Sequence, residues 1–311
     1  MGLQHQAAKP EPSVRQGTGL TLDKRLLSCL GCTALLTLLY IQPLCSLILY
    51  SATTELNSHI LLVPFISAYL IFIRRQKLPG SYTCSLLLAT ASLMAGLAAL
   101  AAAWVLHVTD RLLSRNDYLA LMALSFFCLL TAGGFLFLGR RWMVAAAFPI
   151  AFLIFIVPLP DRAVEWLETA FKFASTDVAH LFFIFSGTPV LRDGTVFQLP
   201  GMVFVVAQEC SGIRSTWVLF ITSLLASYLF LRSPWRRVVL VAFVIPLGIL
   251  RNGFRILVIG LLCVHVGPQM FHSIIHRQGG PLFFALSLLP LFLLLWWLRS
   301  REIGIRARAL D

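Results

Sequence analysis

Charged residues are scarce in this chain. Only 12% of its 311 residues are Asp, Glu, Lys or Arg, whereas 59% are hydrophobic, and the mean hydropathy is +0.86. A soluble domain carries about 25% charged residues, so the composition excludes a soluble globular protein. Apolar runs of about 20 residues recur along the chain, which is the length that an α-helix needs to cross a bilayer.

The chain also lacks the short segments of alternating polar and apolar residues that are typical of a transmembrane β-barrel. We therefore predict an all-α fold, namely a polytopic helical membrane bundle of about eight transmembrane helices. The predicted spans cover residues 26–50, 59–73, 84–107, 118–138, 142–158, 214–231, 237–261 and 281–298.

Acidic residues are rarer than basic ones, with 13 Asp and Glu against 25 Lys and Arg, and the net charge is +12. This charge does not indicate nucleic acid as a partner, because the basic residues fall mainly in short clusters between apolar runs. Such clusters set the orientation of membrane helices and contact anionic lipid headgroups. We therefore expect membrane lipids, and no nucleic acid, among the partners.

The basic clusters lie on one side of the membrane if the predicted spans alternate and both termini are cytoplasmic. This orientation predicts a multi-pass protein of the cell (inner) membrane. Residues 1–23 are predicted to be a disordered cytoplasmic tail, 24–300 the transmembrane domain and 301–311 a basic cytoplasmic tail. Outside the cytoplasm we expect an amphipathic helix at 163–185 and a short hairpin between Thr188 and Ala207.

The cysteines do not form the pattern of a disulfide framework. Of the seven, six lie in apolar stretches, where a thiol acts as a small hydrophobic group. Only Cys210 has polar and cationic neighbours, which are the surroundings that turn a thiol into a nucleophilic thiolate. These neighbours are Glu209, Ser211, Gly212 and Arg214.

Two arginines and two histidines are candidates to act with Cys210. Arg251 and Arg255 are four residues apart in the seventh predicted span, so they share a helix face. An arginine inside a membrane span normally faces a partner or a water-filled cavity. His272 and His276 follow at the outer level, and spacing alone leaves either member of each pair open. No carboxylate or thiol stands beside the histidines, so we predict no metal and no cofactor.

Such a set of side chains fits acyl transfer. A thiolate attacks a carbonyl, an imidazole moves the proton, and a guanidinium stabilises the oxyanion. The active site would lie on the periplasmic or extracytoplasmic face, where Cys210 and the histidines are expected.

Several motifs resemble one known family, the exosortase/archaeosortase family of membrane-embedded cysteine proteases and transpeptidases. The motifs are Ser58-His59 before Leu62-Val63-Pro64, Pro158-Leu159-Pro160, Cys210-Ser211-Gly212-Ile213-Arg214-Ser215, Asn252-x-x-Arg255, and His276 before Gly279-Gly280. Isoleucine at position 60 replaces a glycine that is usual in the family.

The resemblance implies that Cys210 is the nucleophile, His276 the acid/base and Arg255 the electrostatic stabiliser. Supporting or substrate-binding residues would be Glu209, Ser211, Gly212, Arg214, Asn252, Arg251, His59 and His272. The implied partners are proteins with a C-terminal sorting signal of the Pro-Glu-Pro type, made of a short motif, a transmembrane helix and a basic tail. The implied enzyme, a hydrolase acting on peptide bonds, cleaves near the motif and transfers the chain to a membrane or surface acceptor, either a lipid or a glycan.

Two other functions are compatible with parts of the sequence. Basic clusters and intramembrane arginines also suit a non-proteolytic component of exopolysaccharide export or assembly. A transporter that holds an anion with Arg251 and Arg255 would show internal repeats with broken helices, and no convincing repeat is present.

The nucleophile assignment predicts selective alkylation. Cys210 should react faster at neutral pH than any of the other six cysteines, because only a thiolate reacts rapidly. Timed labelling of intact cells with a membrane-impermeant maleimide, followed by peptide mass spectrometry, measures the order of reaction. Slow labelling of Cys210, or labelling only after the cytoplasm is opened, would contradict the assignment.

Overall fold

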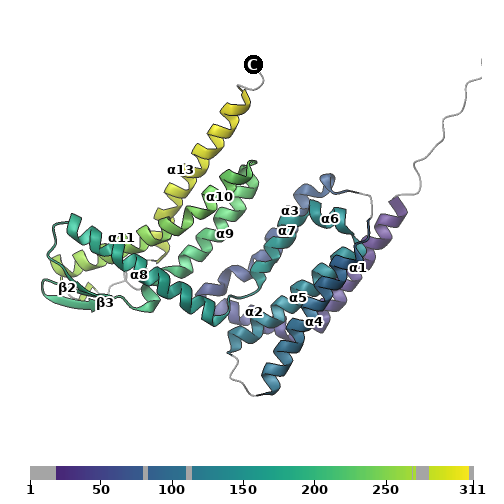
Figure 1. Ribbon diagram of the computed structural model, residues 1–311, viewed down its shortest axis with the longest axis horizontal. Helices are drawn as coiled ribbons and strands as arrows, with labels where there is room; N and C mark the ends of the chain where they lie inside the picture. Colours follow the sequence, from purple (N-terminus) through teal and green to yellow (C-terminus); the bar gives the residue numbers. More distant parts are fainter. Residues whose placement is uncertain (1–18, 80–82, 110–113, 268, 271–279, 308–311) are drawn as a thin grey trace, which may run out of the picture. The chain divides into compact units, whose positions relative to one another are not determined.

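The chain consists almost entirely of helices in the part that the structure describes (Figure 1). The computed structural model describes residues 19–79, 83–109, 114–267, 269–270 and 280–307. Six helices are long and apolar enough to cross a membrane, or up to eight if each of two bent helix pairs counts as one span. This confirms the predicted polytopic helical membrane bundle. The chain divides into two compact units, Met1–Pro160 and Asp161–Asp311.

The first unit is built around two long antiparallel helices, α4 and α5, with α1 beside α5 (Figure 1). Its α-helices are α1 (Gly19–Leu39), α2 (Ile41–Thr53), α3 (Val63–Arg74), α4 (Leu86–Val108), α5 (Arg115–Phe137), α6 (Arg140–Ala145) and α7 (Ala147–Phe152). Its 3-10 helices are η1 (Glu55–Leu61), η2 (Arg75–Lys77) and η3 (Leu153–Ile156). The helices α4 and α5 approach closely at Gly96, where an added Cβ would lie 2.9 Å from Leu129 Cγ.

The first predicted span, 26–50, is not one helix. It consists of α1 and α2, which meet at Tyr40 with a bend of 72°. Pro43 explains the break, because proline cannot donate to the carbonyl four residues earlier and its ring clashes with that carbonyl. The bend is fixed by Tyr40, whose buried hydroxyl donates to Ser125 Oγ at 2.7 Å while Ser125 donates to the Gly96 carbonyl.

The fifth predicted span, 142–158, is also wrong as a single helix. It is divided into α6, α7 and η3, and it reaches the length of a span only when counted together with α8 of the second unit. The same rule accounts for the break, since α6 ends at Ala145, four residues before Pro149.

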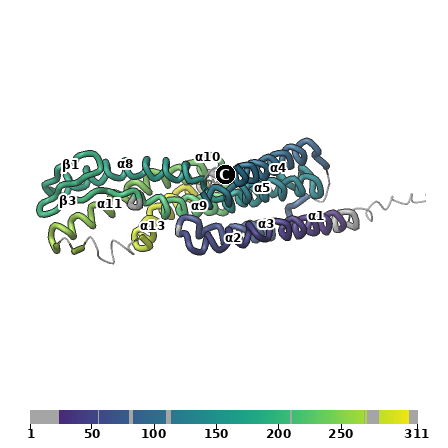
Figure 2. Tube along the Cα trace, turned by 90° about the horizontal axis from the view of Figure 1, so that it is seen from below, coloured from purple at the N-terminus to yellow at the C-terminus, as the bar shows by residue number. Residues whose placement is uncertain are grey.

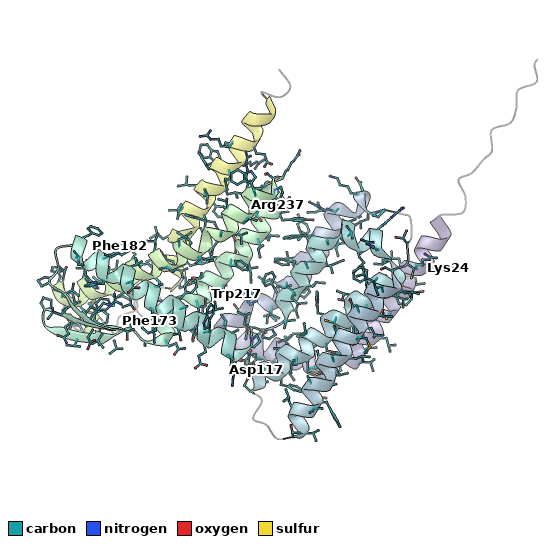
Figure 3. All side chains as sticks on the ribbon, viewed as in Figure 1. Lys24, Asp117, Phe173, Phe182, Trp217 and Arg237 are labelled. Carbon is teal, nitrogen blue, oxygen red and sulfur yellow. The ribbon has the colours of Figure 1, made fainter. Side chains whose placement is uncertain are left out.

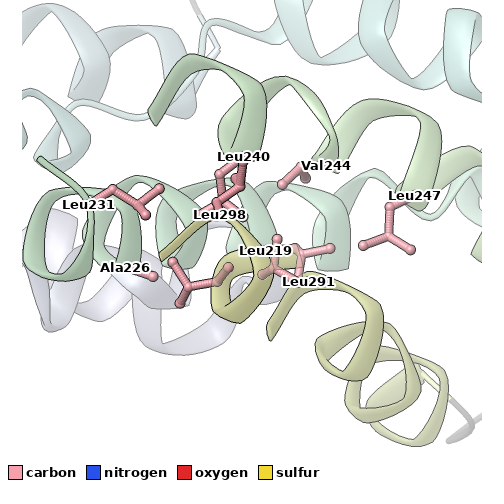
Figure 4. Close-up of a cluster of buried hydrophobic side chains, with 9 residues drawn as sticks. Leu219, Ala226, Leu231, Leu240, Val244, Leu247, Leu291 and Leu298 are labelled. Carbon is pink, nitrogen blue, oxygen red and sulfur yellow. The ribbon is translucent and has the colours of Figure 1, made fainter. Parts of the chain in front are cut away.

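The second unit contains a four-helix bundle formed by α9, α10, α11 and α13. Its elements are α8 (Asp161–Phe185), β1 (Leu191–Asp193), β2 (Val196–Leu199), β3 (Met202–Val205), η4 (Gln208–Ser211), α9 (Ile213–Phe230), α10 (Pro234–Ala242), α11 (Val244–His265) and α13 (Gly280–Ala307). A buried apolar cluster fills the bundle, with Leu219 on α9, Leu240 on α10, Val244 on α11 and Leu291 on α13 (Figure 4).

One end of the bundle is fixed by polar contacts between α9, α10 and α13. Arg237, labelled in Figure 3, donates from Nε and Nη2 to the Leu231 carbonyl at 2.9 and 2.7 Å and so caps the end of α9. The Glu302 carboxylate accepts from the backbone N–H groups of Arg232 and Ser233 just before α10. These contacts supply partners for helix-end groups that the helices themselves leave unpaired.

The short hairpin predicted between 188 and 207 is a three-stranded antiparallel sheet in the order β1-β2-β3. Gly194 and Gly201 lie in its two turns with φ of 57° and 83°, a region that glycine adopts at little cost. The inner face of the sheet buries Phe197 and Leu199 against Phe183 of α8. Figures 1 and 2 both show the sheet beside α8 and α11.

The amphipathic helix predicted at 163–185 is present as α8, and it packs closely on α11. Two glycines of α11, seven residues apart, permit this approach. A Cβ on Gly253 would lie 2.6 Å from Val178 Cγ1, and a Cβ on Gly260 would lie 2.5 Å from Phe183 Cζ. Both distances are shorter than real Cβ contacts, so neither position accepts a side chain without movement of α8.

Replacement of Gly253 tests this close packing. We expect Gly253→Ala to destabilise the protein by about 1–3 kcal/mol, which is the usual cost of overpacking a filled core. Thermal unfolding of the detergent-solubilised protein measures the effect. Gly31→Ala is the matched control, because a Cβ on this α1 glycine would meet no atom within 4 Å. Equal midpoints for the two variants would contradict the packing argument.

Candidate active site

The candidate nucleophile lies in a tight turn at the beginning of α9. Cys210 belongs to η4, and Gly212 follows it as the N-cap residue of α9 with φ of 73°. This left-handed conformation is cheap only for glycine, which explains the glycine two residues after Cys210. For Glu209 and Cys210 the structure describes the backbone alone. Ser211 is buried, and its Oγ accepts from the Ile213 N–H at 3.5 Å.

The Gly212 carbonyl oxygen is the shared acceptor of the hydrogen bonds that stabilise this turn. It accepts from Arg251 Nη2 at 2.9 Å, Thr216 Oγ1 at 2.9 Å and Ser215 Oγ at 3.2 Å. The Thr216 N–H also donates to it at 3.1 Å, as the first regular bond of α9. The position of the turn is therefore set both by its own helix and by a side chain from α11.

Arg251 is the central polar side chain of this arrangement. It is only 8% exposed, and Nη2 donates to Thr216 Oγ1 at 3.0 Å as well as to the Gly212 carbonyl. Its other terminal nitrogen, Nη1, is buried and has no hydrogen-bond partner among the side chains and backbone groups that the structure describes. A buried guanidinium retains its charge, so this corner of the bundle is positively charged.

The helices α9 and α11 run antiparallel and almost touch at the turn. A Cβ on Gly248 would lie 2.6 Å from Thr216 Oγ1, and a Cβ on Gly212 would lie 2.8 Å from Asn252 Oδ1. Asn252 is 2% exposed and has hydrogen-bonding or electrostatic partners in the structure. The glycine on each helix thus faces a polar side chain on the other, which fixes the register of the turn against α11.

The other two arginines of the predicted site lie at the edges of this arrangement. Arg255 is half-buried one helical turn after Arg251, and the two positive charges repel each other. Arg214 is exposed in the first turn of α9. Both have interaction partners within the structure. Of the two arginines that the spacing left open, Arg251 donates a hydrogen bond to the Gly212 carbonyl of the Cys-Ser-Gly turn.

Of the predicted histidines, one belongs to the first unit and two lie outside the described residues. His59 belongs to η1 in the first unit, where its Nδ1 is 3.0 Å from the Leu56 carbonyl and its ring also bonds to the backbone of Phe155. His272 and His276 lie outside the described residues, as do residues 1–18 and 308–311 of the predicted tails.

Three contact residues of the turn, Ser215, Thr216 and Gly248, were not among the predicted site residues. The two hydroxyl residues follow Gly212 by three and four positions, so a helix beginning at Ile213 directs them back to its carbonyl. Gly248 precedes Asn252 by one helical turn, and a glycine at that spacing inside a span is a signal of close helix contact.

The fold and this turn define a polytopic membrane protein with a cysteine at the end of a spanning helix. A family model described as transmembrane exosortase (Exosortase_EpsH) matches residues 50–293. The chain therefore belongs to the transmembrane exosortase family, as the resemblance in its motifs predicted. Neither a curated protein nor a solved structure shows a significant match to the chain.

Gly212 provides a test of the turn with a closely matched control. Gly212→Ala should displace Asn252 and Arg251, because the new Cβ would lie 2.8 and 3.2 Å from their side-chain atoms. Gly187→Ala carries the same left-handed strain, with φ of 73°, but meets no atom within 4 Å. We expect only Gly212→Ala to slow alkylation of Cys210 by about tenfold or more, measured with a fluorescent maleimide. Equal rates in both variants would show that the contacts with α11 do not matter.

Proposed function

We propose that this protein is a membrane cysteine protease and transpeptidase that cleaves the C-terminal sorting signals of exported proteins. The observation that carries the proposal is the Cys210 turn, which precedes a long helix and is held by the buried Arg251. The positive end of a helix and a nearby guanidinium both favour a thiolate over a thiol. Membership in the exosortase family supports the same activity.

The reaction follows the roles that the motifs imply. The Cys210 thiolate attacks the carbonyl carbon of the scissile peptide bond and forms a C–S bond, and the oxygen takes up the negative charge. When the intermediate collapses, the C–N bond breaks and His276 donates a proton to the leaving amine. An acceptor hydroxyl or amine, or water, then attacks the thioester while His276 accepts its proton, and the thiolate is regenerated.

The two arginines of α11 have different electrostatic roles in this proposal. Arg255 stabilises the oxyanion, as the family motif implies. Arg251 holds the turn through Gly212, and its buried guanidinium adds positive charge beside the backbone turn that carries Cys210. Asn252 and Ser211, both buried, keep the turn in register, whereas Glu209, Arg214, His272 and His59 remain candidates for substrate contacts.

The distribution of basic residues supports an extracytoplasmic active site. Arg232, Arg236 and Arg237 lie around the end of α9 that is opposite to Cys210. With 18 residues, α9 is about 27 Å long, close to the hydrocarbon thickness of a bilayer. If the basic end is cytoplasmic, the Cys210 turn lies at the outer surface of the inner membrane. There it would meet the motif of a substrate whose basic tail stays inside.

The expected substrates are membrane proteins that end in a short motif, a transmembrane helix and a basic tail. The acceptor would be a lipid or glycan of the membrane or cell surface. A non-proteolytic role in exopolysaccharide export or assembly gives Cys210 no chemical task, so the nucleophile variant separates the two functions.

Substitution of the nucleophile is the direct test. Cys210→Ala should reduce processing of a tagged sorting-signal protein by at least about 1,000-fold, because loss of a covalent nucleophile removes most of the catalysis. Immunoblots of substrate and product, with enzyme levels measured in the same membranes, record the result. Cys84→Ala, at an exposed cysteine in the first unit, is the control and should process normally. Normal processing by a stably inserted Cys210→Ala protein would overturn the proposal.

A further inference from the structure

The strand β3 is an edge strand that leads directly to the candidate nucleophile. Among the residues that the structure describes, the sheet order β1-β2-β3 leaves one side of β3 without a neighbouring strand, and Val205 precedes Cys210 by five residues. Such an edge presents backbone N–H and C=O groups to any chain that can pair with it.

The register identifies the residues that face the open side. Leu199 and Met202 flank the two-residue turn Pro200-Gly201 and form the first pair of the β2–β3 hairpin. Residues that bond across an antiparallel pair alternate with residues whose backbone groups point away. The Val206 N–H donates to the Thr195 carbonyl at 2.9 Å, which places Met202, Phe204 and Val206 on the bonded side.

Val203 and Val205 therefore direct their N–H and C=O groups away from β2. Their side chains are also accessible, since the two residues are 64% and 56% exposed. The other edge of the sheet differs, because β1 presents Arg192 there, and the Arg192 side chain is tied to Asp177 of α8 at 2.6 Å. Two consecutive outward positions on β3 offer four backbone groups to a partner.

The sheet is a rigid support for such a partner. Phe197 is fully buried and Leu199 nearly so, and both pack with Phe183 of α8 in one apolar cluster. The edge is thus preorganised, and pairing with it costs less conformational entropy than ordering a loop would.

We propose that β3 binds the substrate polypeptide as an added fourth strand, with an extended segment next to the scissile bond paired to Val203 and Val205. This inference rests on the proposed function, because it assumes a peptide substrate. Backbone pairing gives affinity that does not depend on sequence, and alternate substrate side chains then meet the two valines. An extended chain advances about 3.3 Å per residue, so the five residues from Val205 to Cys210 span at most about 17 Å.

Proline substitution tests the hydrogen bonds. Val205→Pro removes an outward N–H but no bond to β2, and proline is accepted on an edge strand in this orientation. Val205→Thr keeps the N–H and the branched shape. We expect kcat/KM for cleavage of a sorting-signal peptide to be about 3- to 10-fold lower in Val205→Pro than in Val205→Thr, the value of one hydrogen bond. Thermal unfolding and alkylation of Cys210 in both variants verify that the fold and the nucleophile are intact.

Crosslinking gives an independent readout. In a protein that combines Val203→Cys with Cys210→Ala, disulfides should form with a substrate that carries single cysteines at successive positions. Strand pairing predicts a period of two residues along the substrate. Equal kcat/KM values in the two Val205 variants, together with crosslinks of no such period, would overturn the inference. The proposed function is tested separately, because it predicts that Cys210→Ala loses cleavage whatever the Val205 variants show. Failure of the strand-pairing inference can therefore be distinguished from failure of the proposed function.

Discussion

The hydrogen bonds between Arg251 and the Cys-Ser-Gly turn are the interaction on which the second unit depends. One guanidinium on α11 reaches both the Gly212 carbonyl and Thr216 at the beginning of α9. A buried charge is tolerated only where such partners compensate for its lost hydration, so these contacts fix the two helices in register. The chain conformation around the candidate nucleophile follows from that register, because Gly212 must avoid Asn252 as well.

The apolar runs were sufficient to predict the class of fold, but they do not indicate where the helices are interrupted. The helices α1, α6 and α10 end at Leu39, Ala145 and Ala242, each four residues before a proline. The prolines were visible in the sequence, yet the apolar runs continue through them, and α10 and α11 together still form one candidate span, Pro234–His265, as predicted. Pro290 shows that a proline does not always end a helix four residues before it, since α13 continues through Pro290 without a break. Whether a proline ends a helix depends on the tertiary contacts that surround it.

The site was predictable where the chemistry is local. Cys210, Gly212 and Arg251 could be chosen because a thiol with polar neighbours, a glycine two residues after it and an arginine inside a span are each recognisable in the sequence. Thr216 and Gly248 have only the spacing signals described above, and their contact with each other and with Arg251 comes from the crossing of two helices that are distant in sequence. The sheet was anticipated only as a hairpin, since strands of three and four residues leave little periodicity to detect.

The unequal lengths of α9 and α11 have a consequence for access to the turn. Gly212 lies level with Asn252, and α11 continues from there to His265, about 20 Å farther. The part of α11 that extends past the turn packs against α8 and the sheet. Under the proposed function, a polypeptide that arrives along α11 from His265 needs about six residues of extended chain to reach the turn. A folded domain joined to the cleavage point by a shorter tether would then be kept away from the turn by its own bulk.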